Sequence, residues 1–252
     1  MRCSNQSPIK HADILRAVST GQVNIGEFLL GQYGNEDPIF AADNMPFVAP
    51  GYDNAYKFYQ AQKPHLEKSL RGRGLRLLYS VAWPGQGIYT KTPLKSIEDL
   101  KGTKFRTYSP MTARLAELLG ANPTVIQATD IPQASATNTV QAMITSSATG
   151  SSSKAWEFVK TYYTTSAFHP KNVVVVNERA FQRLPEPQRK AVLDAAIAAE
   201  KRGWQMSRER EQSGNETLAK NGISVIDRDA GMKGGLGKVG DQIVAQWIKT
   251  AS

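Results

Sequence analysis

Cysteine is nearly absent from this chain, and its scarcity excludes two kinds of site. Cys3 is the only cysteine among 252 residues, so the chain can form no intrachain disulfide and no zinc site built from several cysteines. Histidine is also scarce: His11, His65 and His169 lie far apart and show no metal-ligand spacing. Because HExxH, Walker-type and GxSxG motifs are missing too, the sequence gives no support to a metal hydrolase or a nucleotidase.

Long apolar runs are missing as well. No stretch is apolar over the ~20 residues that a membrane-spanning helix needs. The amino terminus lacks the charged and apolar regions of a secretory signal, which fits a mature or shortened chain as well as a cytoplasmic protein. With 40% hydrophobic and 21% charged residues, the composition is typical of a soluble globular protein with one large domain or two modest ones.

The net charge of +9 raises the possibility of an anionic partner. Basic residues are spread along the chain. The densest group is Lys68, Arg71, Arg73 and Arg76, and no aromatic residue stands between them in the sequence. An ordinary basic surface therefore explains the charge better than a nucleic-acid groove does. We expect no nucleic-acid partner, and a steep salt dependence of binding to random duplex DNA would contradict that expectation.

Helical and strand patterns alternate along the chain, which predicts an α/β fold. The predicted helices are 7–20, 53–70 with Asp53 as N-cap, 111–119, 129–139, 154–162, 186–218 and 239–248. The predicted strands are 23–30, 75–81, 104–107, 124–126, 142–145, 173–176 and 222–226. The helix 186–218 is long enough to span more than one lobe, and the glycine-rich segment 231–237 is predicted to be a flexible loop.

Arg106 is the residue that points most directly to chemistry. It stands near the end of the short strand 104–107, which leads through Ser109 and Pro110 into the next helix. A guanidinium held there can make two parallel hydrogen bonds to a carboxylate, and nearby helix-start N–H groups add partial positive charge. The alternative is an arginine that pairs with a surface Asp or Glu.

Several short motifs follow one another in a recognisable order. They are 21–30 (GQVNIGEFLL), 44–48 (NMPFV), 82–90 (AWPGQGIYT), 96–106 (SIEDLKGTKFR), 120–123 (GANP), 174–178 (VVVNE) and 184–195 (LPEPQRKAVLDA). Each is weak alone, but the order DLKGxKxR, GAxP and NExxxxxLP is fairly specific. The chain thereby resembles the DctP family of extracytoplasmic solute receptors, which serve TRAP (tripartite ATP-independent periplasmic) transporters.

The resemblance implies an α/β fold of two lobes, like that of periplasmic binding proteins, with mixed sheets, crossing hinge strands and a long interlobe helix. We expect residues 1–83 and 171–210 to form the first lobe, and 84–170 and 211–252 to form the second. Relatives begin with a signal peptide, a strand and a helix before the segment with which this chain starts. The first lobe is therefore expected to lack its first strand and helix, and the open sheet edge would favour a homodimer.

The same resemblance implies a periplasmic binding protein, not an enzyme, that needs no cofactor. It would bind a small organic acid, close over it and deliver it to a TRAP permease. Arg106 aligns with the arginine that grips the ligand carboxylate in such proteins. Gln86 stands where many relatives have a second arginine, which favours a keto or hydroxy monocarboxylate over a dicarboxylate. An enzyme acting on a small organic acid in the same cleft is the alternative.

The other candidate ligand-binding residues each have a structural alternative. Trp83 could stack on a ligand or fill the space between the lobes, and Gln86 could donate from its amide or face solvent. Tyr108 could donate its hydroxyl to the acid or pack half-buried. Thr145 and Ser146 could offer polar side chains from the second lobe or belong to a plain turn.

Trp156 and Leu29 complete the candidate set, and packing is the alternative for both.

Some relatives hold a metal ion beside the acid. Here no Asp or Glu occurs between Gln141 and Ala155, and hard cations prefer carboxylate oxygens, so we expect no metal.

Overall fold

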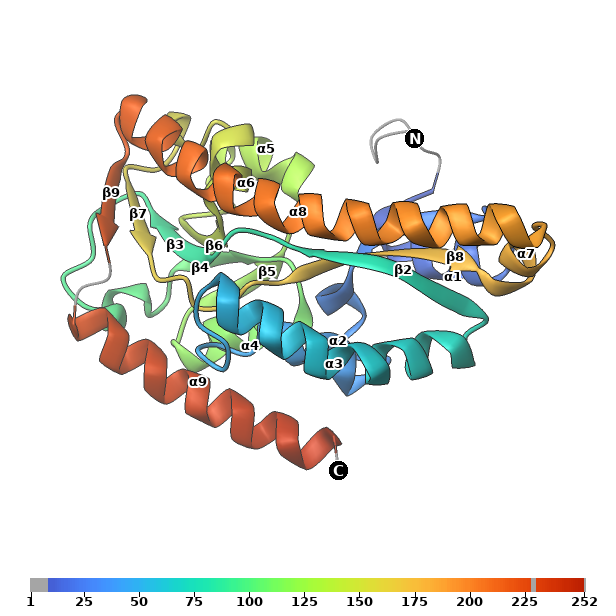
Figure 1. Ribbon diagram of the computed structural model, residues 1–252. Helices are drawn as coiled ribbons and strands as arrows, with labels where there is room; N and C mark the ends of the chain where they lie inside the picture. The colour runs from blue at the N-terminus through green and yellow to red at the C-terminus, as the bar shows by residue number, and fades with distance from the viewer. Residues whose placement is uncertain (1–8, 228–229, 252) are drawn as a thin grey trace.

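Two β-sheets organise the molecule, whose computed structural model describes residues 9–227 and 230–251 (Figure 1). One sheet has three strands in the order β1-β8-β2, and the other has six in the order β5-β4-β6-β3-β7-β9. We refer to the part built on the three-stranded sheet as lobe 1 and to the part built on the six-stranded sheet as lobe 2.

The strands are β1 (Ile25–Leu29), β2 (Leu75–Ala82), β3 (Gln86–Thr90), β4 (Lys104–Thr107), β5 (Asn122–Val125), β6 (Ala142–Ser146), β7 (Thr161–Thr164), β8 (Lys171–Asn177) and β9 (Ser224–Asp227). The α-helices are α1 (Ile14–Ser19), α2 (Pro38–Ala41), α3 (Tyr52–Gly72), α4 (Pro110–Leu118), α5 (Ile131–Ala136), α6 (Ser147–Ser152), α7 (Glu178–Gln182), α8 (Glu186–Lys220) and α9 (Ala230–Ala251). The 3-10 helices are η2 (His11–Asp13), η3 (Leu30–Tyr33), η4 (Ala42–Asn44), η5 (Ile97–Leu100), η6 (Ala128–Asp130) and η7 (Ala155–Glu157).

Lobe 1 is centred on β8, which pairs antiparallel with β1 on one side and with β2 on the other. Its run of four valines is buried on both faces, as a continuous apolar sequence predicts for a central strand. The helices α1 and α3 pack against this sheet. Within the described residues, the outer edge of β1 pairs with no strand.

Lobe 2 contains a mixed sheet. The strand β4 runs parallel to β5 and β6, whereas β3 runs antiparallel to β6 and β7. All five residues of β3 are buried. Tyr89 and Tyr162 stack with ring centroids 4.1 Å apart, and Gly87 lies so close to the Tyr162 ring that a side chain there would collide with it.

Three segments and one further helix connect the lobes. The chain crosses from β2 to β3 and returns from β7 to β8. The helix α8, about 50 Å long at 1.5 Å per residue, packs on β2 in lobe 1 and on α6 and β9 in lobe 2 (Figure 1). The helix α9 packs on α4 and η5 in lobe 2 and on α2 in lobe 1, where Trp247 Nε1 donates to the Pro38 carbonyl at 2.7 Å.

Most predicted elements are present with small boundary shifts; residues 7–8 of the first predicted helix lie outside the described residues. The predicted 104–107 strand coincides with β4, and the long helix extends over α8. Asp53 was wrongly predicted as an N-cap: Gly51 takes that position, and Asp53 lies in the first turn of α3. None of the helices that the structure describes is both long and apolar enough to cross a lipid bilayer.

Two further predictions of local structure were wrong. Residues 154–162 do not form one helix: η7 is short, and the chain then enters β7, because Thr161 and its neighbours pair with β3 and β9. The segment 231–237 is not a loop but part of α9. Its glycines serve packing at one position at least, since a side chain at Gly235 would collide with Ile97 of η5.

Candidate functional site

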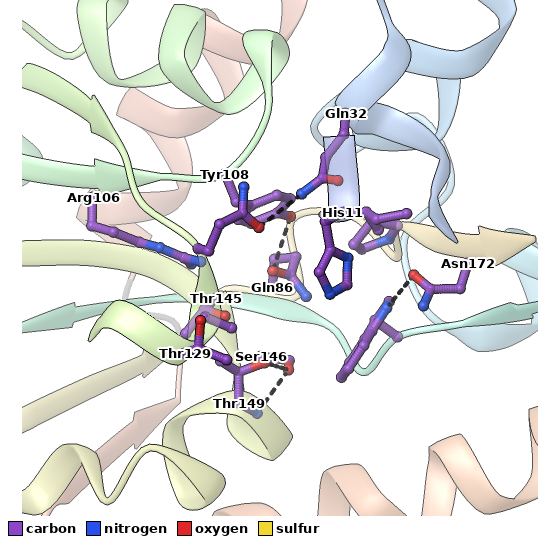
Figure 2. A pocket seen from close by; sticks show the side chains of 15 residues that line it. His11, Gln32, Gln86, Arg106, Tyr108, Thr129, Thr145, Ser146, Thr149 and Asn172 are labelled. Atoms are coloured by element: carbon purple, nitrogen blue, oxygen red, sulfur yellow. Dashed lines mark hydrogen bonds between the residues drawn. The ribbon is translucent and has the colours of Figure 1, made fainter. Parts of the chain in front are cut away.

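A cleft of about 300 Å³ opens between the lobes (Figure 2). Its walls come from both sheets and from the segments that cross between them. It is lined by His11, Leu29, Gln32, Trp83, Gln86, Arg106, Tyr108, Gln127, Ala128, Thr129, Thr145, Ser146, Thr149, Pro170 and Asn172. All of the predicted ligand-binding residues except Trp156 are therefore brought together at one place.

Arg106 is fixed on the lobe 2 wall with only 2% of its surface exposed. Its Nε donates to the Ile126 carbonyl at 2.9 Å, and its Nη1 donates weakly to the Ile144 carbonyl at 3.4 Å. Among the described residues, no Asp or Glu forms an ion pair with it. Burial lowers the pKa of Arg106 to about 10, so the guanidinium stays charged at neutral pH. The alternative of a surface ion pair is thereby excluded.

The local sequence explains why Arg106 is held so firmly. Strand β4 lies between two parallel partners, β5 and β6, which fix its backbone on both sides. The strand then passes into α4, where Ser109 caps the helix by accepting from the Thr112 N–H at 3.2 Å and Pro110 occupies the first turn. Such a guanidinium is preorganised to bind an anion, because its orientation costs little entropy on binding.

Gln86 and Tyr108 form a buried hydrogen-bonded pair in the cleft. The Tyr108 hydroxyl donates to Gln86 Oε1 at 3.0 Å, and Gln86 Nε2 donates to the Pro84 carbonyl at 2.8 Å. Gln86 is 2% exposed and lies on β3, so the alternative of a solvent-facing loop residue was wrong. Burial raises the pKa of Tyr108 well above its usual value, which keeps the hydroxyl protonated. The Tyr108 hydroxyl donates its proton to Gln86, and the second N–H of the Gln86 amide remains available for another acceptor.

Thr145 and Ser146 lie at the end of β6, on the lobe 2 side of the cleft. Both are buried, and Ser146 Oγ accepts from the Thr149 N–H at 3.2 Å as the N-cap of α6. The two residues belong to a strand end and a helix start, not to the plain turn that was the alternative. Their hydroxyls, with that of Thr149, give this wall a polar surface.

Trp83 and Leu29 face the cleft from the crossing segment and from lobe 1. Trp83 is 37% exposed, and its Nε1 donates to Asn172 Oδ1 at 2.8 Å. Asn172 in turn donates from Nδ2 to Glu27 Oε1 at 2.9 Å. The orientation of the indole at the edge of the cleft is therefore fixed by a chain of hydrogen bonds through Asn172 to Glu27 in lobe 1.

Trp156 lies elsewhere. It follows α6 in η7 and packs against the buried cluster that contains Tyr89 and Tyr162. Its position corresponds to the packing alternative.

Several residues of the cleft were not predicted from the sequence. Gln32 of η3 and Gln127, just after β5, meet across it, with Gln32 Nε2 donating to Gln127 Oε1 at 3.3 Å. Gln127 follows the carboxyl end of a strand in a partly parallel sheet, and that position could have identified it. His11, Gln32 and Asn172 had no such signal, because their approach depends on how the lobes meet.

A metal site receives no support from the described residues, among which no three His, Cys, Asp or Glu side chains are grouped to hold an ion. Arg106 with amides and hydroxyls is instead a donor set suited to an organic anion.

Comparison with known proteins identifies the family. The profile of the DctP family, described as bacterial extracellular solute-binding protein, family 7, matches residues 3–248. The chain belongs to this family. The prediction made from the order of motifs is confirmed, and with it the two-lobe α/β fold.

Solved structures and a curated relative support this membership. DctP7 of Bordetella pertussis, an extracytoplasmic solute receptor binding pyroglutamic acid, is 44% identical with a TM-score of 0.96, over 98% of this chain and 82% of that one. A TRAP solute-binding protein specific for pyroglutamate, from an unidentified marine microbe, is 34% identical with a TM-score of 0.94, over 98% and 81%. The 2,3-diketo-L-gulonate-binding periplasmic protein YiaO of Escherichia coli strain K12 is 24% identical over 94% of this chain and 73% of its own length.

Proposed function

We propose that this protein is a periplasmic receptor that binds pyroglutamate and delivers it to a TRAP permease. The observation that carries the proposal is Arg106, a buried guanidinium without a carboxylate partner among the described residues, facing a cleft of about 300 Å³ between two lobes. A buried charge without a partner is costly, and a ligand carboxylate would remove that cost through two charge-assisted hydrogen bonds.

A single carboxylate suits this cleft better than two. Arg106 is the only Arg or Lys among the described residues that line it. Where a second arginine would bind a second carboxylate, Gln86 presents a neutral amide whose remaining N–H can donate to a carbonyl. A lactam carbonyl fits this donor, and pyroglutamate carries one carboxylate and one lactam carbonyl.

The relatives point to the same ligand. Two structures that are 44% and 34% identical to this chain are receptors for pyroglutamate, and each covers nearly all of it. The volume of the cleft also favours a small acid over a sugar acid with a long polar chain.

Titration calorimetry on protein freed of bound ligand by unfolding and refolding tests the proposal. We expect L-pyroglutamate to bind more tightly than glutamate or succinate, and Arg106→Ala to weaken it by roughly 100-fold or more, since the bidentate charged pair is lost. Arg106→Lys, which keeps the charge but not the fork, should recover only part of that loss. Unchanged affinity in Arg106→Ala would reject the carboxylate clamp.

The proposed receptor releases its ligand unchanged. Incubation with pyroglutamate, followed by proton NMR of the acid, should therefore recover the same compound in full. Catalytic loss of the acid would favour the enzyme alternative instead.

A further inference from the structure

The amide side chains that line the cleft are not equally satisfied. The oxygens of Gln86, Gln127 and Asn172 each accept a hydrogen bond, from Tyr108 at 3.0 Å, from Gln32 at 3.3 Å and from Trp83 at 2.8 Å. Gln32 Oε1 is different: it is buried and has no hydrogen-bond partner among the described residues. A buried acceptor without a donor is unfavourable, so this oxygen marks a place where a ligand donor would be stabilised.

The backbone that carries Gln32 is tightly held. It belongs to η3, which follows β1, and the neighbouring Gly31 packs so closely on Asn44 that a side chain would collide. Tyr33, next along the chain, is anchored by its hydroxyl, which donates to the His11 carbonyl at 2.8 Å. Gln32 therefore projects from a fixed position on lobe 1 into the cleft, beside Tyr108 and His11 (Figure 2).

The Gln32 amide is also held in one orientation. Its Nε2 donates to Gln127 Oε1 across the cleft. Turning the Gln32 amide over by itself would place its oxygen against the oxygen of Gln127 and lose this bond, so the two amides take their orientations together. Oε1 is thus presented as an acceptor, and a carbonyl oxygen, unlike a hydroxyl, cannot become a donor.

The hydroxyls of the cleft lack this selectivity. Thr129, Thr145, Ser146 and Thr149 each carry a group that either donates or accepts after a rotation. They can bind a ring N–H or a ring oxygen about equally well. A fixed acceptor discriminates strongly, because a ligand without the donor leaves it unpaired.

We propose that Gln32 makes this receptor selective for acids that carry a ring N–H, by accepting that N–H at its Oε1. The inference rests on the proposed function, in which Arg106 on lobe 2 binds the carboxylate. Gln32 on lobe 1 then accepts the hydrogen bond from the ring N–H. The ligand class is the cyclic amides with a carboxylate on the carbon next to the ring nitrogen. Because Gln32 also bonds Gln127, recognition of the N–H occurs at a contact between the two lobes.

The test compares L-pyroglutamate with its isosteric lactone, 5-oxotetrahydrofuran-2-carboxylate, which has a ring oxygen in place of the N–H. Titration calorimetry with the wild-type protein should show at least ~100-fold preference for pyroglutamate, since the lactone sets two acceptors against each other. In Gln32→Met, pyroglutamate should bind more weakly and the preference should fall to within about threefold. Equal affinities in the wild type, or a preference kept by Gln32→Met, would overturn the inference.

Gln127→Glu is the matched control, because its carboxylate still accepts from Gln32 Nε2 and so keeps the Gln32 oxygen facing the ligand, while its negative charge repels both acids. It should weaken both ligands by a similar factor and keep their ratio. Gln32→Glu keeps an acceptor while adding a negative charge, so it should weaken both acids and still prefer the lactam; loss of the preference there would contradict the inference. If wild-type protein bound neither acid, the proposed function would fail together with the inference, whereas equal binding of both would leave that function standing.

Discussion

Asp43 and Lys171 form a buried ion pair beside the segment that returns the chain from lobe 2 to lobe 1. The Lys171 Nζ lies 3.4 Å from Asp43 Oδ2, and the two side chains are 1% and 0% exposed. The Lys171 N–H donates to Asp43 Oδ2 at 2.8 Å, and Asn44 Nδ2 donates to Asp43 Oδ1 at 2.6 Å. Burial raises the pKa of Asp43 and lowers that of Lys171, and each partner opposes the shift of the other. Each charge therefore depends on the other.

Removing one member of this pair should be much worse than removing both. We expect Lys171→Met to lower the free energy of unfolding by about 3–5 kcal/mol, because it leaves the Asp43 carboxylate buried and unpaired. Adding Asp43→Asn should recover part of this loss, since the amide oxygen still accepts from the main-chain N–H of residue 171. Urea unfolding of the single and double variants measures the effect. Equal stability of the two would contradict the argument.

Lys190→Met is a suitable control for that experiment. Lys190 pairs with Asp194 at 2.7 Å on the surface of α8, where both side chains are largely exposed. Removal of an exposed pair should change the unfolding free energy by less than about 1 kcal/mol.

At the same scale, the sequence predicted the cleft unevenly. Arg106 and Gln86 were identified because they stand within short motifs of known order, and Tyr108 because it follows the same strand. Gln32 and Asn172 were not, since nothing local distinguishes them from surface amides. They line the cleft only because of how the two lobes pack together, and that packing is determined by contacts between residues far apart in the chain.

The helix α8 shows how one element can connect both lobes. It needs close approach at two places, and glycine provides it at each: Gly203 lies against Val81 of β2, and Gly214 lies against α6. A Cβ at position 214 would lie 2.8 Å from Ser147 Oγ and 2.9 Å from its backbone carbonyl carbon. The carbonyl carbon cannot move away without shifting α6, which begins at the cleft, and turning Oγ away would break its hydrogen bond to the Glu211 carbonyl.

Gly214→Ala should therefore destabilise the protein despite the higher helix propensity of alanine. We expect a loss of about 1–3 kcal/mol from overpacking, read from urea unfolding. Gly237→Ala in α9 is the matched control: nothing lies within 4 Å of the place that an alanine Cβ would take there, so alanine should raise stability by up to about 1 kcal/mol. A stabilising Gly214→Ala would show that α6 and α8 are less closely packed than the distances indicate.

Elements with strong local signals were the ones that the sequence predicted. The valine run of β8 is a continuous apolar sequence and α8 is a long stretch rich in good helix formers, and no tertiary contact overrides either signal. The strand β7 was missed because Thr161, Tyr162 and Tyr163 follow a helical turn, and only their pairing with β3 and β9 makes them extended. The helical state of 231–237 was missed because its glycines favour a loop until packing on η5 is considered.

For the whole molecule, the connections between the lobes converge on His169. Its Nδ1 lies 3.2 Å from the Trp83 carbonyl of the other crossing segment. Its ring packs on Tyr52 with centroids 4.4 Å apart, and its Nε2 is buried without a hydrogen-bond partner among the described residues. The charged groups that act on it are Glu211 and Arg208 of α8 and Lys171 of β8. His169 thus lies beside both crossing segments and α8.

Burial lowers the pKa of His169 below its usual 6.5, against the opposing effect of Glu211. The folded protein therefore binds this proton less readily than the unfolded chain does. The stability that follows is fully present above pH 6.5 and is lost as the pH falls below that value, where the unfolded chain takes up the proton first.

We expect the unfolding free energy of the wild type to decline as the pH falls below 6.5, and His169→Gln to flatten this decline, because glutamine has no proton to gain. Carboxylates other than Glu211, which acts on the ring, contribute about equally to both proteins and cancel in the difference. His65→Gln, which changes an exposed histidine on α3, should keep the wild-type slope. Parallel curves for His169→Gln and the wild type would show that the histidine between the lobes does not carry this dependence.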